Sequence, residues 1–109
     1  MTKHNCDNTV AVSLAQNGRK DVPNLPLSAD TLGWAYHHNC ESAAAAPTLE
    51  NAVKAVTNHQ TYRNHLGLTH QKLQNPSRAK GELQEAISID PQSRVAEQAR
   101  RAIGQKPLS

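Results

Sequence analysis

The side chains best suited to chemistry are imidazoles and thiols, and they gather in the segment His37-His38-Asn39-Cys40, with His4 and Cys6 elsewhere. Imidazole nitrogens and thiolates are good zinc ligands. Adjacent histidines on a helix point about 100° apart, however, so both rarely reach one ion. We therefore expect exposed polar residues at a helix end and no metal site. A metal or redox sensor built from His37, His38 and Cys40 is the alternative from another functional class.

Catalysis would require a base within reach of a nucleophile. The chain has no nucleotide-binding loop, no G-x-S-x-G elbow and no zinc-protease motif. His59, His65 and His70 complete the histidines, and none is set beside a nucleophile. The sequence predicts a protein that is not an enzyme and that needs no cofactor.

Composition limits both the fold and the partners. The 109 residues suffice for one domain. Hydrophobic residues make up 37% and aromatic residues 3%, with no Phe, which is too little for one large core but enough for thin stacked layers. The net charge of +3 is carried by scattered residues, so nucleic-acid binding is not expected.

The cellular compartment is predicted from features that the sequence lacks. It holds no apolar run of about 18 residues, so no membrane span is expected, and its N-terminal residues lack the apolar core of a signal peptide. Two cysteines make no disulfide framework. The sequence therefore predicts a cytoplasmic protein with two reduced thiols.

The elements that must position these residues follow from an internal repeat. Residues 30–36 return 34 residues later as residues 64–70. Six positions match at this offset: Leu32 with Leu66, Gly33 with Gly67, Tyr36 with the ring of His70, Ala45 with Ala79, Leu49 with Leu83, and Ala52 with Ala86. A fixed period of roughly 20–50 residues indicates a repeat array.

These residues resemble the tetratricopeptide repeat, a 34-residue helix–turn–helix. The pattern L-G-x-x-aromatic, then A-x-x-x-L and a later Ala, closes on Pro91 in the second repeat. Thr57 stands at the proline position of the first repeat, and Ala29 and Arg63 stand where the family has tryptophan. The string A-D-T-L-G-W-A-Y is similar to repeats of bacterial envelope and polysaccharide-export proteins, which suggests a bacterial-type member.

The resemblance implies an all-α, right-handed α-solenoid of about two and a half repeats with a C-terminal capping helix. We expect a disordered tail over 1–8 and one domain over 9–104. That domain divides into a half repeat (9–22), repeat 1 (26–59), repeat 2 (60–93) and a capping helix (94–104), followed by a tail (105–109). Helices are predicted over about 9–20, 27–39, 42–57, 60–73, 76–89 and 92–103.

Helix ends and packing can be predicted in detail. Ser42 and Asn75 are expected N-caps, Pro47 is expected near a first turn, and Gly104 is expected to end the last helix. Glycine costs about 1 kcal/mol against alanine inside a helix. Its recurrence at Gly33 and Gly67 therefore indicates a close approach of the partner helix.

The resemblance also implies a concave surface, lined by the first helix of each pair, that binds a peptide or helix of a partner protein. The positions that match this lining are Leu27, Asp30, Trp34, His37, His38, Thr61, Asn64, Leu68, Gln71, Lys72 and Gln98. Trp34 is the expected hot spot, unless it only packs against the next repeat. Asn64 is expected to hydrogen-bond an extended peptide.

Three features narrow or compete with this interpretation. Trp34 and Leu68 follow the two glycines, so the Lys-Gly-Asn-like string of repeats that clamp chaperone C-termini is missing. The unpaired N-terminal half repeat, with Val10 and Leu14, offers homodimerisation as an alternative. The half repeat also allows the chain to be a piece of a longer scaffold.

Overall fold

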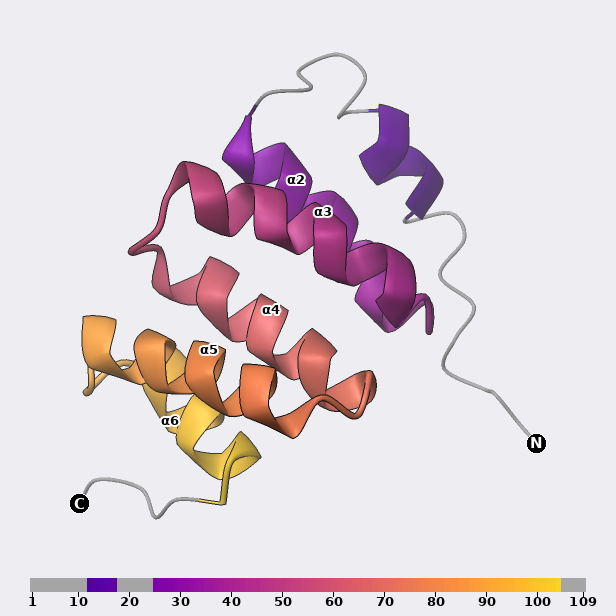
Figure 1. Cartoon of the computed structure of the whole chain (residues 1–109). Helices are drawn as coiled ribbons and strands as arrows, with labels where there is room; N and C mark the ends of the chain where they lie inside the picture. The colour runs from indigo at the N-terminus through magenta and orange to yellow at the C-terminus, as the bar shows by residue number, and fades with distance from the viewer. Residues whose placement is uncertain (1–11, 18–24, 105–109) are drawn as a thin grey trace.

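The computed structural model describes residues 12–17 and 25–104, and these residues form helices joined by short turns (Figure 1). Residues 12–17 are helical, and the described part of the chain contains no strand. The helices that follow are α2 (Pro26–His38), α3 (Ser42–Ala55), α4 (Gln60–Lys72), α5 (Pro76–Ile89) and α6 (Arg94–Ala102). The predicted tails over 1–8 and 105–109 lie outside the described residues, as does part of the half repeat.

The helices form a stack of pairs, as predicted. α2 packs most closely against α3, and α4 against α5, while α3 packs on α4 and α5 on α6 (Figure 1). The bounds of α2 to α6 agree with the predicted ranges to within two residues. None of the described helices is long and apolar enough to cross a membrane.

Each pair is held at close range by its glycine. A Cβ added to Gly33 would lie 2.5 Å from Leu49 Cγ, and one added to Gly67 would lie 2.6 Å from Leu83 Cγ. Both leucines are fully buried. The close approach predicted from the recurring glycines is confirmed: each leucine occupies the space that any larger residue would need.

The core is built from small residues around these leucines. Ala29, Ala45 and Ala52 are buried with Leu49 in one cluster, which Tyr62 and Leu66 of α4 extend toward the second pair. Alanines on facing helices let the backbones approach, and this explains how a chain without Phe closes a core. Leu73, the C-cap of α4, lies outside this core and is 39% exposed.

Several predicted helix ends are corrected. Glu41 rather than Ser42 is the N-cap of α3, and Pro47 lies inside this helix, beyond its first turn. Pro47 therefore lacks the N–H that would bond to the carbonyl of residue 43. Asn75 is the N-cap of α5, as predicted, but its side chain makes no capping hydrogen bond.

Two caps come from residues that were not predicted. The His59 side chain accepts a hydrogen bond from the backbone N–H of Tyr62, at 3.4 Å. Ser93 Oγ accepts one from Ala96, at 3.0 Å. Gly104 follows α6 with a φ of +78°, in the left-handed region that favours glycine, so its predicted role as a helix stop is confirmed.

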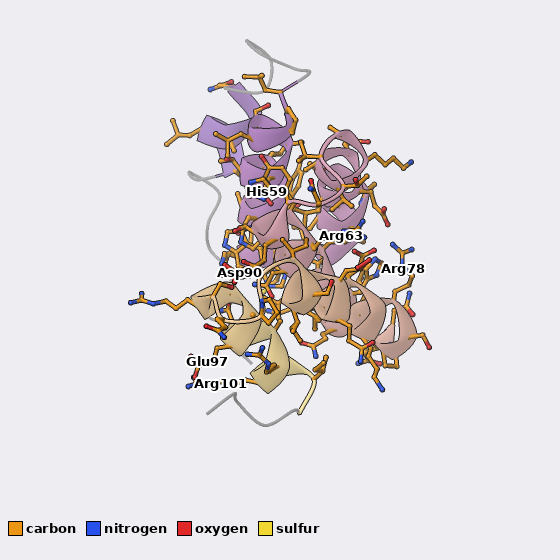
Figure 2. The ribbon with its side chains drawn as sticks, turned by 90° about the vertical axis from the view of Figure 1, so that its left-hand side faces the viewer. His59, Arg63, Arg78, Asp90, Glu97 and Arg101 are labelled. Carbon is orange, nitrogen blue, oxygen red and sulfur yellow. The ribbon has the colours of Figure 1, made fainter. Side chains whose placement is uncertain are left out.

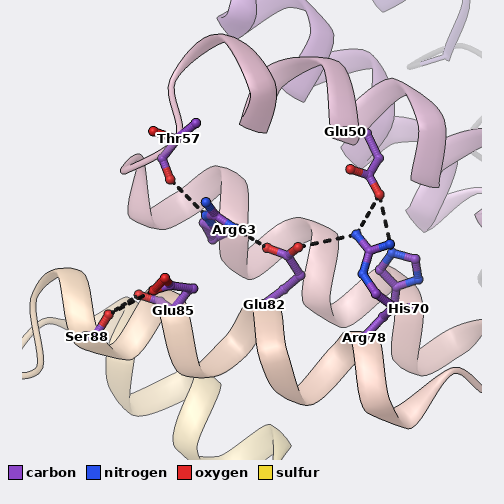
Figure 3. Close-up of polar contacts among 8 residues, drawn as sticks. All are labelled: Glu50, Thr57, Arg63, His70, Arg78, Glu82, Glu85 and Ser88. Carbon is purple, nitrogen blue, oxygen red and sulfur yellow. Dashed lines mark hydrogen bonds and ion pairs between the residues drawn. The ribbon is translucent and has the colours of Figure 1, made fainter.

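Ion pairs and hydrogen bonds of charged side chains link α3, α4 and α5 along one edge of the helix stack (Figure 3). Arg78 Nη2 lies 2.7 Å from a Glu50 oxygen and 3.3 Å from a Glu82 oxygen. Arg63 bonds to Glu82 at 2.8 Å and donates to the carbonyl of Thr57 at 2.8 Å. These contacts fix how the second pair sits on the first, and they keep the acidic groups of this edge occupied.

His70 is a packing residue beneath this edge, as predicted from its match with Tyr36. It is 7% exposed, and its Nε2 lies 3.8 Å from Glu50 (Figure 3). Burial lowers the pKa of His70, and the Arg78 charge lowers it further, while Glu50 and Glu82 oppose the shift. The ring thus favours its neutral form, as suits a core position.

Candidate functional site

The helices α2, α4 and α6 form one face of the stack, called the inner face here, because side chains bond directly from each to the next. His65 Nδ1 lies 2.8 Å from Asp30 Oδ1, and His37 Nδ1 lies 2.9 Å from Thr69 Oγ1. Between α4 and α6, Asn64 Nδ2 donates to Gln98 Oε1 at 2.9 Å.

The sequence separations of these bonds follow from the repeat. They are 35, 32 and 34 residues, close to the period, because equivalent helices lie side by side. The Gln71 side chain extends the same row by donating to the carbonyl of Ala102, 31 residues on, at 2.7 Å. The first helices are therefore joined by polar bonds, whereas the helices within a pair are joined by apolar packing.

Trp34 lies where α2 meets α4. Its ring is parallel to those of His37 and His65, with centroids 4.5 Å and 3.7 Å away. The His38 ring meets it edge-on at 4.6 Å. Trp34 therefore packs against the next repeat, and it remains half-buried, so part of the indole reaches the surface.

Three of the predicted lining residues lie largely beneath the inner face. Asp30 and His37 are each 6% exposed, and Asn64 is 2% exposed. All three bond to the neighbouring helix, as described above. Asn64 Oδ1 is buried without a hydrogen-bond partner in the described part of the chain. These residues shape and hold the surface from below.

The other predicted residues form the accessible part of the inner face. Leu27 is 63% exposed. Thr61 and Leu68 are half-buried, and the exposed members are His38, Gln71, Lys72 and Gln98. On α2 the predicted positions recur three or four residues apart, which places them on one stripe of the helix.

His65 belongs to this surface and was not predicted. It stacks on Trp34 and bonds to Asp30, and its side chain is 14% exposed. The repeat did not indicate it, because its equivalent in the first repeat, Thr31, is not among the predicted lining positions.

The ionisable groups around Trp34 act on one another. Burial lowers the pKa of His37 to about 4, with Lys72, His38 and His65 adding repulsion. Burial also lowers the pKa of His38, again with Lys72 and His65 contributing. His37 is therefore neutral at pH 7, and Lys72 provides the permanent charge.

Cys40 is disulfide-bonded, which corrects the expectation of a free thiol at this position; Cys6 lies outside the described residues. Disulfides are rare in a reducing cytosol, so this bond weighs against the cytoplasmic prediction. Within residues 12–17 and 25–104, no group of three or more His, Cys, Asp or Glu side chains is arranged to hold a metal ion.

Two open pockets lie beside α6, at the C-terminal end of the stack. One, of about 570 Å³, is lined by Gln71, Gln74, Pro76, Ala79, Lys80 and Ile103. The other, of about 400 Å³, is lined by α6 residues, among them Glu97 and Arg101, which Figure 2 shows at this end. Sequence reasoning missed both, although Gly104 at the position equivalent to Tyr36 and His70 signals a missing ring.

Comparison with known proteins identifies the class of fold. No protein-family model and no curated protein matches the chain. A solved structure described as "MamA MSR-1 C2", a protein that contains tetratricopeptide repeats, matches with a TM-score of 0.69 and 20% sequence identity. The match covers 89% of this chain and 58% of that one, so this chain spans little more than half of its length. The protein therefore has a tetratricopeptide-like fold.

Proposed function

We propose that the protein is a non-catalytic interaction module that holds a peptide or helix of a partner protein against its inner face. The observation that carries the proposal is the row of chemically different side chains that are at least partly exposed along α2, α4 and α6. Leu27 and Trp34 offer apolar surface, and Gln71, Lys72 and Gln98 offer donors and a charge. This mixture of an aromatic anchor with polar groups around it is typical of protein-binding surfaces.

The buried bonds beneath this surface support the same proposal. Asp30, His37 and Asn64 join neighbouring helices, so the spacing between the first helices is fixed before any partner arrives. A rigid surface loses little conformational entropy on binding, which favours affinity.

The test is affinity capture from a lysate of the source organism, with mass spectrometry, using two matched apolar-to-acidic changes. Leu27→Asp alters the inner face, and Ile89→Asp alters α5 at a residue that is 37% exposed. Both residues are partly exposed, so both variants should keep their helical circular dichroism. We expect the partner to be lost with Leu27→Asp and kept with Ile89→Asp. Equal capture by the two variants would place the working surface elsewhere.

Self-association is a second candidate, favoured by one observation. Leu14, in the helical residues 12–17, is 66% exposed, and such an apolar side chain suits a contact with another copy. Val10, the other residue of this interpretation, lies outside the described residues. A light-scattering mass that rises with concentration in the wild type, and not in Leu14→Asp, would support it. A constant monomer mass would reject it.

A further inference from the structure

The larger of the two pockets, of about 570 Å³, lies where α6 is shorter than the helix that precedes it in the inner face. α4 runs to Lys72, whereas α6 ends at Ala102, the equivalent of Leu68, one helical turn before the end of α4. Gly104, with its φ of +78°, then takes the chain out of the helix. α6 therefore lacks the last turn that α4 has.

The equivalent place at the preceding junction is filled by protein. Subtracting the period of 34 from three of the pocket residues, Gln71, Ala79 and Ile103, gives His37, Ala45 and Thr69. His37 and Thr69 are both buried, and they are bonded at 2.9 Å. Thr69 belongs to the last turn of α4, so the occupant of this space one repeat earlier is the C-terminal turn of a helix.

The side chains of the pocket suit an occupant of the same kind. Its apolar members are Ala79, Pro76 and Ile103. Its polar members include Gln74 and Lys80, which are exposed, and no ion pair among the described residues includes Lys80. The last carbonyls of a helix have no partner within the helix, and this end carries a partial negative charge. An ammonium and an amide beside apolar surface therefore match a helix C-terminus.

The beginning of α5 adds to this preference. Pro76 is the first residue of α5 and lines the pocket, as does Ala79 one turn on. The first turn of α5 holds no acidic residue, and the side chain of its N-cap, Asn75, makes no capping hydrogen bond. The partial positive charge at this helix N-terminus is therefore not offset by its own first turn, and it favours the negative end of another helix.

We infer that this pocket holds the C-terminal turn of a helix of the partner protein. An aliphatic side chain of that turn packs against Ala79 and Ile103, and its last carbonyls accept hydrogen bonds from Lys80 and Gln74. The inference rests on the proposed function, because Gln71, which donates to the carbonyl of Ala102, lines both the pocket and the inner face. It selects a helix over an extended peptide, and it assigns the end of that helix to α6.

Three synthetic peptides test the inference. Each is alanine-rich with Glu–Lys pairs, amidated, and about 16 residues long, so that it is partly helical in water. One has a single leucine in its last turn, one has the leucine in its first turn, and one has none. Backbone amide shifts of the full ¹⁵N-labelled chain are followed during titration.

We expect saturable shifts at Ala79, Lys80 and Ile103 with the peptide that has leucine in its last turn. The peptide without leucine should bind about tenfold more weakly, because no aliphatic side chain is buried. The peptide with leucine in its first turn should also bind more weakly, since its leucine and its free carbonyls lie at opposite ends. Equal binding by all three peptides, or by the two that contain leucine, would overturn the inference, as would the absence of shifts at these residues.

A matched pair of charge reversals supplies the control. Lys80 and Lys54 are both exposed, and Lys80 lines the pocket whereas Lys54 lies at the end of α3. We expect Lys80→Glu to weaken binding of the last-turn peptide by about fivefold, because a carboxylate then faces the helix carbonyls. Lys54→Glu should leave this binding nearly unchanged. Equal weakening in both variants would show an effect of net charge alone and would overturn the inference.

The two proposals fail in different ways. If Leu27→Asp abolishes partner capture while no peptide shifts the pocket amides, the inner face binds its partner and the assignment of the pocket is wrong. If the last-turn peptide binds through Lys80 while Leu27→Asp leaves capture unchanged, the pocket binds helix ends and the proposed function of the inner face is wrong.

Discussion

An alanine at Gly33 would have no room for its methyl group. Its Cβ would lie 2.5 Å from Leu49 Cγ and 2.7 Å from Leu49 Cδ2, where ordinary contact begins at 3.4 Å. The Leu49 side chain cannot simply swing away, because it is fully buried and the clash includes its branch point. The Leu49 backbone nitrogen, at 3.3 Å, also limits how the helices can part.

Two opposing terms decide the size of the effect. Overpacking a well-packed core lowers the free energy of unfolding by about 1–3 kcal/mol. Alanine in a helix interior is favoured over glycine by about 1 kcal/mol. Gly33→Ala should therefore lower the free energy of unfolding by about 0–2 kcal/mol, a net value too small to interpret without a reference for the propensity term.

Gly81 supplies that reference. It lies inside α5, and a Cβ added there would meet nothing within 4 Å. Gly81→Ala should stabilise the protein by about 1 kcal/mol, through propensity alone. The difference between the two variants isolates the steric cost, about 1–3 kcal/mol. Urea unfolding followed by circular dichroism measures both, and Gly67→Ala should behave as Gly33→Ala does, since its Cβ would lie 2.6 Å from Leu83 Cγ.

A further substitution tests the cause. Leu49→Ala removes the Cγ and Cδ atoms that block the new methyl group, so Gly33→Ala should cost less in a Leu49→Ala protein than in the wild type. Such coupling is expected between residues in contact. The steric reasoning would be refuted by a Gly33→Ala protein as stable as Gly81→Ala, or by strictly additive effects of the two changes at positions 33 and 49.

Three further predictions concern the core, the inner face and the surface. Leu83→Ala should lower the free energy of unfolding by about 2–5 kcal/mol in urea, because it opens a cavity at a fully buried position. The free energy of unfolding should decrease as pH falls from 6.5 to about 4, because His37 takes up a proton more readily in the unfolded chain. This decrease is at most about 3 kcal/mol. A His37→Gln protein should lack this part of the pH dependence of stability. Arg101→Ala should change stability by less than about 0.5 kcal/mol, because the pair with Glu97 is exposed, and a thermal melt beside the wild type checks this.

The fold could be predicted because the repeated residues pack according to their spacing along each helix, and that spacing can be read from the sequence. The glycines at 33 and 67, with the leucines at 49 and 83, recur at one offset and define the pair packing wherever they occur. Helix ends were less predictable. Ser42 looked like an N-cap from its residue type alone, whereas it is the first residue of the helix and Glu41 is the N-cap.

The inner face was predictable in position but not in detail. The offset of 34 compares each residue with its equivalent, whereas the bonds between repeats join residues that are not equivalent, such as Asp30 with His65. The burial of Asn64 and His37 likewise depends on a neighbouring helix, and no pattern within their own helix reports it. For this reason the sequence could mark the lining without separating its buried members from its accessible ones.

The two junctions of the inner face share a geometry and differ in chemistry. At the junction of α2 with α4, aromatic and basic side chains meet around Trp34, whereas α4 and α6 are joined by amides, as in the bond from Asn64 to Gln98. Trp34 has Leu68 and Ala102 as its equivalents, so the side chains of this row become smaller toward α6. Under the proposed function, a partner segment lying along the row would place its bulkier apolar residues near α6. Because this order is not symmetric, a segment bound there as proposed should have one preferred direction, and a peptide with the reversed sequence should bind more weakly.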